Sequence, residues 1–417
     1  MINTKLSFSL LYLWLLFWPW STKLILRPAE TNYLEIAFYL NSLFLLALIG
    51  LNVIGFFKNR NLKSEDKKIQ PLWWWGVMSI FIISTLSIIW APDQFLALSR
   101  WLNLVNALFV FYLVLNSHPL YRERALKFFL LGLIIPALLG IIQFSSQIAP
   151  ASKYFGLAAH NPSDLGVSVV ETNSGRFLRA YGSFDHPNIL GGVMALGAIL
   201  ALFLALKSKT KKEERIVLLA LFLIFSTALF ASFSRAAIFA FALALLALIF
   251  SQRQTFWRKG SSFIIGLIIL STLSFFAYQP LVNGRADLNA RLEVKSISER
   301  TLYLQQAGEI IINNPVRGVG VGNYIVALMG NFPNLSIWSY QPVHNYWLLV
   351  WAELGIFGLL AVVLLWFAVL KKSFNNKTWS LWLLLFFLSL FDHWLWTQPA
   401  VLAMCLFIAC LISASDY

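Results

Sequence analysis

His344 is the side chain whose type and position best suit it to act as a general base. Histidine changes charge near neutral pH and can therefore take a proton from a hydroxyl group. His344 and Asn345 begin a hydrophobic stretch, and His344 shares a helical stripe with Trp347 and Trp351. Glu353 lies nine residues further on, half a turn out of phase, so we do not expect it to orient His344. A histidine within an interfacial belt of aromatic residues is the alternative interpretation.

A second candidate group is the pair Asp392-His393, which follows another hydrophobic stretch. A carboxylate at that position can orient His344 or an acceptor hydroxyl. A solvated helix end is the competing interpretation, and the local sequence does not decide between the two.

Arginines are the candidates for binding an anion. Arg235 follows Phe233-Ser234 between two hydrophobic stretches, and Arg300 and Arg179 lie in polar loops. Arginine presents a planar fork of N–H donors that matches phosphate oxygens, and each charge-assisted hydrogen bond contributes roughly 1.5–3 kcal/mol. These arginines therefore suggest a phosphate clamp. The alternative for Arg235 is a side chain that extends to lipid headgroups.

Several other motifs do not indicate a reaction. The run Gly318–Gly322 lacks the G-x-G-x-x-G spacing of a nucleotide loop. No carboxylate pair, D-x-D motif or His/Cys cluster predicts a metal site. We interpret Cys405 and Cys410 as packing residues and His160 as a loop residue.

The elements that position these residues are hydrophobic helices. The chain has 417 residues, of which 12% are charged and 59% hydrophobic, whereas soluble domains carry about 25% charged residues. This composition predicts an all-α polytopic membrane protein that forms one domain over residues 1–417. The first stretch lacks a cleavage site, so we expect it to be a retained helix. Twelve stretches are long enough to be spans at roughly 20 residues each: 6–26, 34–57, 72–91, 95–116, 125–148, 188–206, 216–232, 235–251, 260–279, 345–370, 379–391 and 395–413.

The charge pattern predicts the orientation of these helices. With the N-terminus inside, 20 of the 32 lysines and arginines fall on the inner side, as the positive-inside rule requires. The net charge of +14 is therefore a topology signal and does not indicate a nucleic-acid partner. Two long loops, 149–187 and 280–343, then face outward, and loops of that length are usually functional.

Local patterns predict structure within both loops. Val167–Glu171 and Arg176–Tyr181 flank Asn173-Ser174-Gly175 and predict a hairpin. Asp185 or Ser183 is the expected N-cap of the following helix, with Pro187 in its first turn. In the second loop we expect an amphipathic interfacial helix with Ser298 as N-cap and Pro315 as its stop; Arg300, Leu304, Ala307 and Ile311 share one face.

Four segments together resemble the O-antigen ligase and O-antigen polymerase superfamily of bacterial envelope glycosyltransferases. They are RAYGSFDHPNILGG, FASFSRAA, ERTLYLQQAGEIIINNPVRGVGVGNY and VHNYWLLVWAELGIFG, in that order within roughly residues 75–410. The resemblance implies a metal-independent enzyme without a cofactor. It would transfer a glycan from a polyprenyl diphosphate carrier to an acceptor hydroxyl, such as one on the lipid A core.

The resemblance also implies roles for individual residues. The essential histidine of the family falls on His344, and its two essential arginines fall on Arg235 and Arg300. A late aspartate corresponds to Asp392, and the arginine of the first motif is Arg179. The supporting residues implied are His186, Asn188 and Asn345.

The resemblance further implies a multi-pass protein of the bacterial inner membrane with its active site facing the periplasm. Its partners would be the lipid-linked glycan donor, a glycan or lipid acceptor, and membrane lipids. Within the superfamily, the residues do not separate a ligase from a polymerase or a protein O-glycosyltransferase. A transporter or lipid flippase is the alternative from another class, but such proteins usually show paired ionisable groups near the midplane and symmetric halves.

Overall fold

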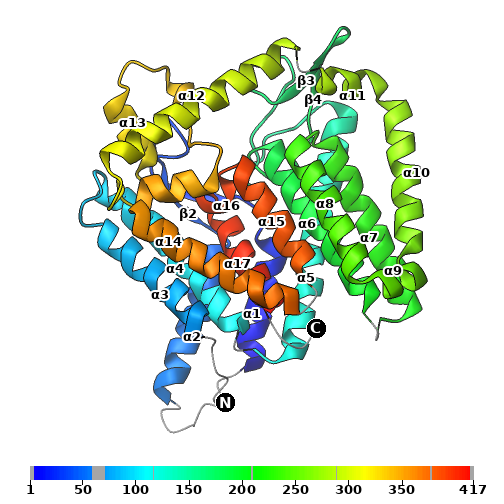
Figure 1. The fold of residues 1–417 in the computed structure, drawn as a ribbon, viewed down its shortest axis with the longest axis horizontal. Helices are drawn as coiled ribbons and strands as arrows, with labels where there is room; N and C mark the ends of the chain where they lie inside the picture. The colour runs from blue at the N-terminus through cyan, green and yellow to red at the C-terminus, as the bar shows by residue number, and fades with distance from the viewer. Residues whose placement is uncertain are drawn as a thin grey trace.

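The computed structural model describes residues 4–58, 71–115, 117–207, 210–287, 289–375 and 378–413 (Figure 1). The described part is mostly helical, as expected. Its helices are α1 Thr4–Phe17, α2 Ser42–Lys58, α3 Pro71–Ser87, α4 Gln94–Leu115, α5 Pro119–Ser146, α6 Pro187–Leu206, α7 Lys212–Ala231, α8 Arg235–Ser251, α9 Arg253–Lys259, α10 Ser261–Ala277, α11 Gln279–Ala286, α12 Arg291–Asn313, α13 Tyr324–Asn331, α14 Tyr346–Asn375, α15 Trp379–Phe391, α16 Trp394–Thr397 and α17 Pro399–Ser413.

Two small antiparallel hairpins and one short 3₁₀ helix complete the described elements. The first hairpin pairs β1 Lys23–Arg27 with β2 Ile36–Tyr39, and the second pairs β3 Val169–Thr172 with β4 Gly175–Leu178. The 3₁₀ helix, η1, covers Ile337–Ser339. The second hairpin confirms the one predicted in the first long loop.

Fewer helices qualify as membrane spans than the twelve expected. Among the described residues, five helices are long and apolar enough to cross a membrane: α4, α5, α6, α7 and α14. Counting each of two bent pairs as one span, α8 with α9 and α10 with α11–α12, gives up to seven. The helical membrane character is therefore confirmed, whereas the count of twelve is not.

The first hydrophobic stretch is not one long helix, contrary to expectation. Helix α1 ends at Phe17, and Lys23–Arg27 form strand β1. Pro19 explains the early end, because the residue before a proline is disfavoured in the helical region. The second stretch is shortened in the same way, since Ile36–Tyr39 pair with β1 and α2 begins only at Ser42.

Helix α6 forms the buried centre of the protein. Every residue from Ile189 to Leu206 is buried, and the helix packs against α5, α7, α8 and α15. Two glycines permit this close packing. A Cβ atom on Gly191 would lie 2.6 Å from Ser232 Oγ, and one on Gly192 would lie 2.5 Å from the Trp394 ring. The start of α6 is thereby held against the start of α8 and against α16.

The cap of α6 differs from the prediction. His186, rather than Asp185 or Ser183, is the N-cap, and its Nδ1 accepts a hydrogen bond from the Asn188 amide at 3.1 Å. Pro187 occupies the first position of the helix, as predicted. The cap therefore comes from a residue also implied in the site.

Helix α14 is broken at Gly355, where φ is +69°. The glycine run Gly318–Gly322 packs into the break. Its Val319 and Gly320 amides donate to the carbonyl oxygens of Ala352 and Glu353 at 2.9 and 2.8 Å. A run that resembles a nucleotide loop thus satisfies backbone groups that the broken helix leaves open.

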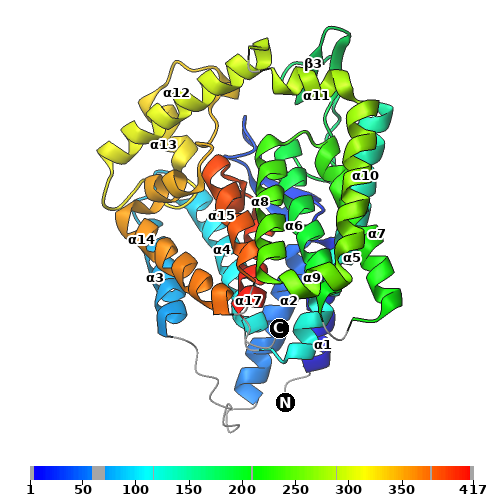
Figure 2. The same ribbon diagram turned by 45° about the vertical axis from the view of Figure 1, so that its right-hand side comes forward.

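Helix α12 crosses the top of the helical bundle in both views (Figures 1 and 2). It begins at Arg291, two turns before the predicted N-cap Ser298, whose hydroxyl lies within the helix and donates to the Lys295 carbonyl oxygen. Ala307 and Ile311 are buried as expected, but Leu304 is 47% exposed. The predicted stop is correct, since the helix ends at Asn313, before Pro315.

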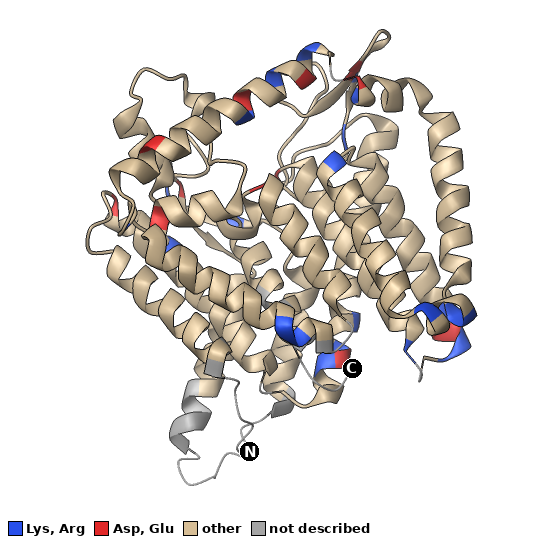
Figure 3. Cartoon of the chain, viewed as in Figure 1, with Lys and Arg blue, Asp and Glu red and all other residues tan. Residues whose placement is uncertain are grey.

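Charges are distributed unevenly between the two ends of the bundle. Lysines and arginines predominate at the lower end in Figure 3, around α9 and the end of α14, with few acidic residues among them, whereas the upper end carries a more even mixture of both signs. This distribution agrees with the asymmetry read from the sequence. Part of the basic set used in that prediction, within residues 59–70 and at 209 and 377, lies outside the described residues.

Candidate active site

His344 lies just before α14, and Asn345 fixes its position. The Asn345 Oδ1 accepts hydrogen bonds from the amides of Trp347 and Leu348, both at 3.0 Å, so this side chain caps the helix. Its Nδ2 donates to the carbonyl oxygen of Leu390 at 3.1 Å. Asn345 therefore ties the start of α14 to the end of α15.

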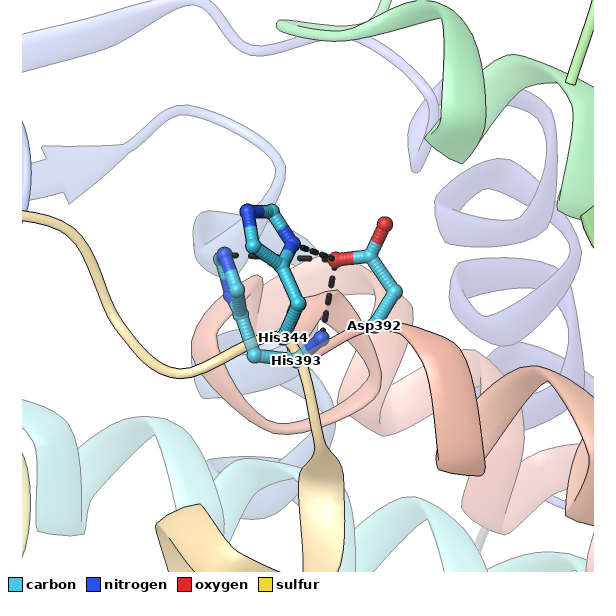
Figure 4. A group of neighbouring side chains, drawn as sticks. All are labelled: His344, Asp392 and His393. Atoms are coloured by element: carbon cyan, nitrogen blue, oxygen red, sulfur yellow. Dashed lines mark hydrogen bonds and ion pairs between the residues drawn. The ribbon is translucent and has the colours of Figure 1, made fainter. Parts of the chain in front are cut away.

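That tie brings His344 to Asp392, the residue that follows α15 as its C-cap. The His344 Nδ1 lies 3.3 Å from Asp392 Oδ1 (Figure 4). Asp392 Oδ1 also accepts from the His393 amide at 2.8 Å. Burial alone would raise the pKa of Asp392, but the hydrogen bond from His344 and the neighbouring histidines hold this pKa below its ordinary value. The carboxylate is ionised at neutral pH and is oriented towards the imidazole.

Glu353 has a different role from Asp392, as the helical phase predicted. Its Oε2 accepts from the Trp396 indole at 2.8 Å and from the Gly322 amide at 2.9 Å. Glu353 thus joins α14, α16 and the glycine run, and it makes no contact with His344.

A polar chain leads from Asp392 to a buried arginine. Asn188 Nδ2 donates to Asp392 Oδ2 at 3.2 Å, and Arg179 Nη2 donates to Asn188 Oδ1 at 2.9 Å. Arg179 Nε donates to the Ser232 carbonyl oxygen at 2.7 Å. Burial lowers the pKa of Arg179 to about 10, so the guanidinium is charged at neutral pH.

His186 lies beside this chain. Its Nδ1 caps α6, and its Nε2 lies 3.0 Å from the Ser168 hydroxyl. Burial, followed by the positive charge of Arg179, lowers the pKa of His186 to about 3. With both ring nitrogens occupied and the ring neutral, His186 positions the start of α6.

Arg235 is the first residue of α8 and forms an ion pair with Glu293 near the start of α12. Arg285 of α11 forms an ion pair with the other oxygen of the same carboxylate. The Glu293 side chain is 4% exposed, whereas that of Arg235 is 42% exposed. Arg300 lies two turns beyond Glu293 on α12, and the charges of Arg235 and Arg300 both contribute to lowering the pKa of Arg179. The predicted arginines therefore share one electropositive region.

Sequence reasoning missed Arg285 and Glu293. Arg285 lies in a short polar segment with no pattern of its own, and Glu293 precedes the residue predicted to begin α12. The signal that could have found them is the charge pattern, since both lie in the second long loop with Arg300.

Comparison with protein families gives an independent result. Residues 219–363 match a family model described as O-antigen ligase. This match, over about a third of the chain, supports a relationship to the O-antigen ligase and polymerase superfamily. The resemblance seen in the four sequence segments is thereby confirmed. No curated protein matches the chain.

The matched O-antigen ligase segment contains part of the site. It includes His344, Arg235, Arg285, Glu293 and Arg300. The remaining partners, Arg179, Asn188 and Asp392, lie outside the segment and join it through the hydrogen bonds described above.

The fold also brings together a group that can hold a metal ion. Ligand atoms of His344, Asp392 and His393 lie within 4.8 Å of one another (Figure 4). Two imidazoles and one carboxylate are a donor set that Zn²⁺ uses. The sequence has no motif for this group, because 48 positions separate His344 from Asp392, and the expectation of a site without a metal stays a prediction. The distances among His344, Asp392 and His393 are equally consistent with a hydrogen-bonded network that holds no metal. In that network His393 Nδ1 lies 2.9 Å from the Thr397 hydroxyl.

Proposed function

We propose that this superfamily member transfers a glycan from a polyprenyl diphosphate carrier to an acceptor hydroxyl on the outer face of the cytoplasmic membrane. In this proposal His344 is the general base, and Arg235, Arg300, Arg179 and Arg285 bind the diphosphate. The observation that carries the proposal is the polar chain His344–Asp392–Asn188–Arg179. It connects a base to an arginine cluster, which is the pairing that this reaction needs.

The arrangement of His344 suits proton removal. Asp392 accepts at Nδ1, which places the proton on that nitrogen and leaves Nε2 free to accept one from the acceptor hydroxyl. The acceptor oxygen then forms a bond to the anomeric carbon, and the bond from that carbon to the diphosphate oxygen breaks. The electron pair stays on the diphosphate, and one displacement of this kind inverts the anomeric centre. General-base catalysis typically contributes about 10²–10⁴-fold to such a step.

The arginine cluster suits the leaving group. A diphosphate gains negative charge as the glycosidic bond breaks, and positioned cations stabilise that charge in the transition state. One carboxylate, that of Glu293, forms ion pairs with both Arg235 and Arg285. We interpret this carboxylate as an internal anion that marks a position for a phosphate oxygen and gives way when the donor binds.

The acceptor separates the members of the superfamily. We favour a ligase that uses a hydroxyl of the lipid A core or a similar glycolipid. An O-antigen polymerase would use the end of a growing glycan, and a protein O-glycosyltransferase would use a side-chain hydroxyl. Purified protein with one lipid-linked donor and each acceptor class distinguishes these activities directly.

The test of the proposed site separates chemistry from binding. We expect His344→Ala to lower transfer by about 10²–10⁴-fold while the protein still binds the carrier lipid. Arg235→Ala and Arg300→Ala should each weaken diphosphate binding by roughly 10- to 150-fold, which corresponds to about 1.5–3 kcal/mol. Arg258→Ala, an exposed arginine on α9, is the matched control. Normal turnover in His344→Ala, or unchanged diphosphate affinity in both arginine variants, would refute the assignment.

A further inference from the structure

A cavity of about 50 Å³ lies next to His393, on a different branch of the polar network from the arginines. The arginines are reached from Asp392 through Asn188, whereas the cavity is reached through His393. Two of its lining residues contact that histidine: the Thr397 hydroxyl lies 2.9 Å from His393 Nδ1, and the Tyr33 ring meets the imidazole edge-on at 5.8 Å between centroids. The cavity is therefore connected through His393 to Asp392 and His344, the candidate catalytic pair.

One polar group of the lining lacks a partner. Tyr324 is 1% exposed, and its hydroxyl makes no hydrogen bond within the described part of the chain. A buried hydroxyl without a partner costs roughly 1–3 kcal/mol. A ligand that supplies a hydrogen-bonding atom would remove this cost, and Tyr324 is part of the lining of the cavity.

The charges of the lining suit a neutral occupant. Arg100 and Glu353 both line the cavity, and each is engaged by a neighbouring group of the fold, so neither presents an unpaired charge to an occupant. Arg100 is engaged with the carbonyl oxygen of Tyr33 at 2.9 Å, and Glu353 accepts from the Trp396 indole. Asn103 adds an amide. Aromatic faces combined with amide, hydroxyl and paired charged groups provide both the apolar contact and the hydrogen bonds that a polyol needs.

The volume sets the size of the occupant. A buried water needs roughly 10–15 Å³ of such space, so this cavity holds about four water-sized groups. A whole sugar ring does not fit, but a short polar arm does, such as a hydroxymethyl or acetamido group, with the ring remaining outside.

We propose that this cavity binds the polar arm of a neutral acceptor sugar and so holds the acceptor hydroxyl next to His344. The inference rests on the proposed function and extends it to the acceptor side. Donor diphosphate and acceptor sugar then occupy separate branches of the network, which meet at Asp392.

Binding of simple glycosides to the full-length protein in detergent tests this site. The probes are methyl glucoside, methyl N-acetylglucosaminide and methyl xyloside, and saturation-transfer NMR is the readout. The xyloside lacks the hydroxymethyl arm. We expect one of the first two to bind with strong transfer to its arm protons and the xyloside to bind more weakly. Equal binding of all three, or of none, overturns the proposal.

Two variants show whether the binding occurs in the cavity. Tyr324→Phe removes the orphan hydroxyl and should weaken glycoside binding by about 2- to 12-fold, the equivalent of one hydrogen bond. A purely structural hydroxyl predicts no such loss, because it has no partner in the fold. Leu104→Phe fills the cavity and should abolish binding. Unchanged glycoside affinity in both variants overturns the proposal.

Pyrophosphate binding, measured on the same samples, tests the arginine cluster separately. Retained pyrophosphate affinity with lost glycoside binding supports the acceptor site. Glycoside binding in a protein that does not bind pyrophosphate contradicts the proposed transfer function and leaves the cavity as a sugar site of another kind. The two failures are therefore distinguishable.

Discussion

Asp392→Asn is the most informative single substitution in the candidate site. Asp392 is 7% exposed and accepts hydrogen bonds from His393 and Asn188 while it lies 3.3 Å from His344 Nδ1. Asparagine keeps the shape of the side chain but removes its charge. It also offers an NH₂ group where one carboxylate oxygen accepted a hydrogen bond. The substitution therefore tests the electrostatic and orienting role with little change in packing.

The expected loss has two parts. A hydrogen bond to a charged group contributes roughly 1.5–3 kcal/mol, and because about 1.4 kcal/mol corresponds to tenfold in rate, this part lowers kcat by about 10- to 150-fold. If the new NH₂ group faces the imidazole, it donates to Nδ1 and moves the ring proton to Nε2. That nitrogen then cannot accept the acceptor proton, and the loss extends to the full general-base contribution of about 10²–10⁴-fold.

The assay is steady-state transfer from a synthetic polyprenyl diphosphate glycan, with kcat and KM for donor and acceptor measured separately. We expect kcat to fall while KM for the donor changes little, since the arginines still bind the diphosphate. Asp185→Asn is the matched control, because Asp185 lies on the neighbouring loop and accepts only from Gln398 at 3.2 Å among the described contacts. A variant at position 392 with kcat within threefold of wild type would refute the role of the carboxylate.

Three further predictions follow from contacts in and near the site. Glu293→Gln frees two arginines, so pyrophosphate affinity in calorimetric titration should rise about tenfold or more, given roughly 1.5–3 kcal/mol per charged hydrogen bond; lower affinity would mean that the carboxylate only positions the arginines. Gly355→Ala places a Cβ 2.0 Å from a backbone oxygen at a φ of +69° and should lower the melting temperature, with Gly308→Ala, which meets nothing within 4 Å, as the control. Burial lowers the pKa of His186 to about 3 and of His393 to about 4, so below about pH 6.5 the unfolded chain binds protons that the native state does not. The free energy of unfolding should therefore be lower at pH 5.5 than at pH 7.5 by roughly 1 kcal/mol per histidine. Equal melting temperatures at both pH values would contradict this prediction.

The sequence predicted features that local patterns encode. Most hydrophobic runs contain a helix, although the first two also overlap strands β1 and β2. The turn at Asn173-Ser174-Gly175 predicts the β3–β4 hairpin, and Pro315 predicts the end of α12. Helical phase also separated Glu353 from His344 correctly, because α14 is regular from its start at Tyr346 to Glu353. Each of these depends on residues within a few turns of one another.

Features that depend on distant contacts were missed. At the break in α14, backbone amides of the glycine run about 35 residues earlier donate hydrogen bonds to the open carbonyl oxygens of the helix. Gly355 alone does not predict this break from the sequence. The start of α12 was placed at Ser298, the best local cap, whereas Glu293 anchors an earlier start through ion pairs to Arg235 and Arg285. Local cap preference is worth about 1 kcal/mol, which is less than the cost of leaving the buried Glu293 carboxylate without its arginine partners.

The location of the site follows from the cost of burying polar groups. A helix surrounded by apolar side chains, as α6 is, cannot place a charged or amide side chain along its length without a partner. Its polar residue Asn188 therefore occurs at its first turn. The same holds for Arg235 at the start of α8, Asp392 at the end of α15 and His344 before α14. Four helix ends are held together by α6 glycines and by Asn345, and only this convergence places the base and the arginines within one polar network. A site of this kind is encoded in the packing that brings the ends together. This explains why its residue types were predictable, whereas of its connections only the possible pairing of Asp392 with His344 was anticipated.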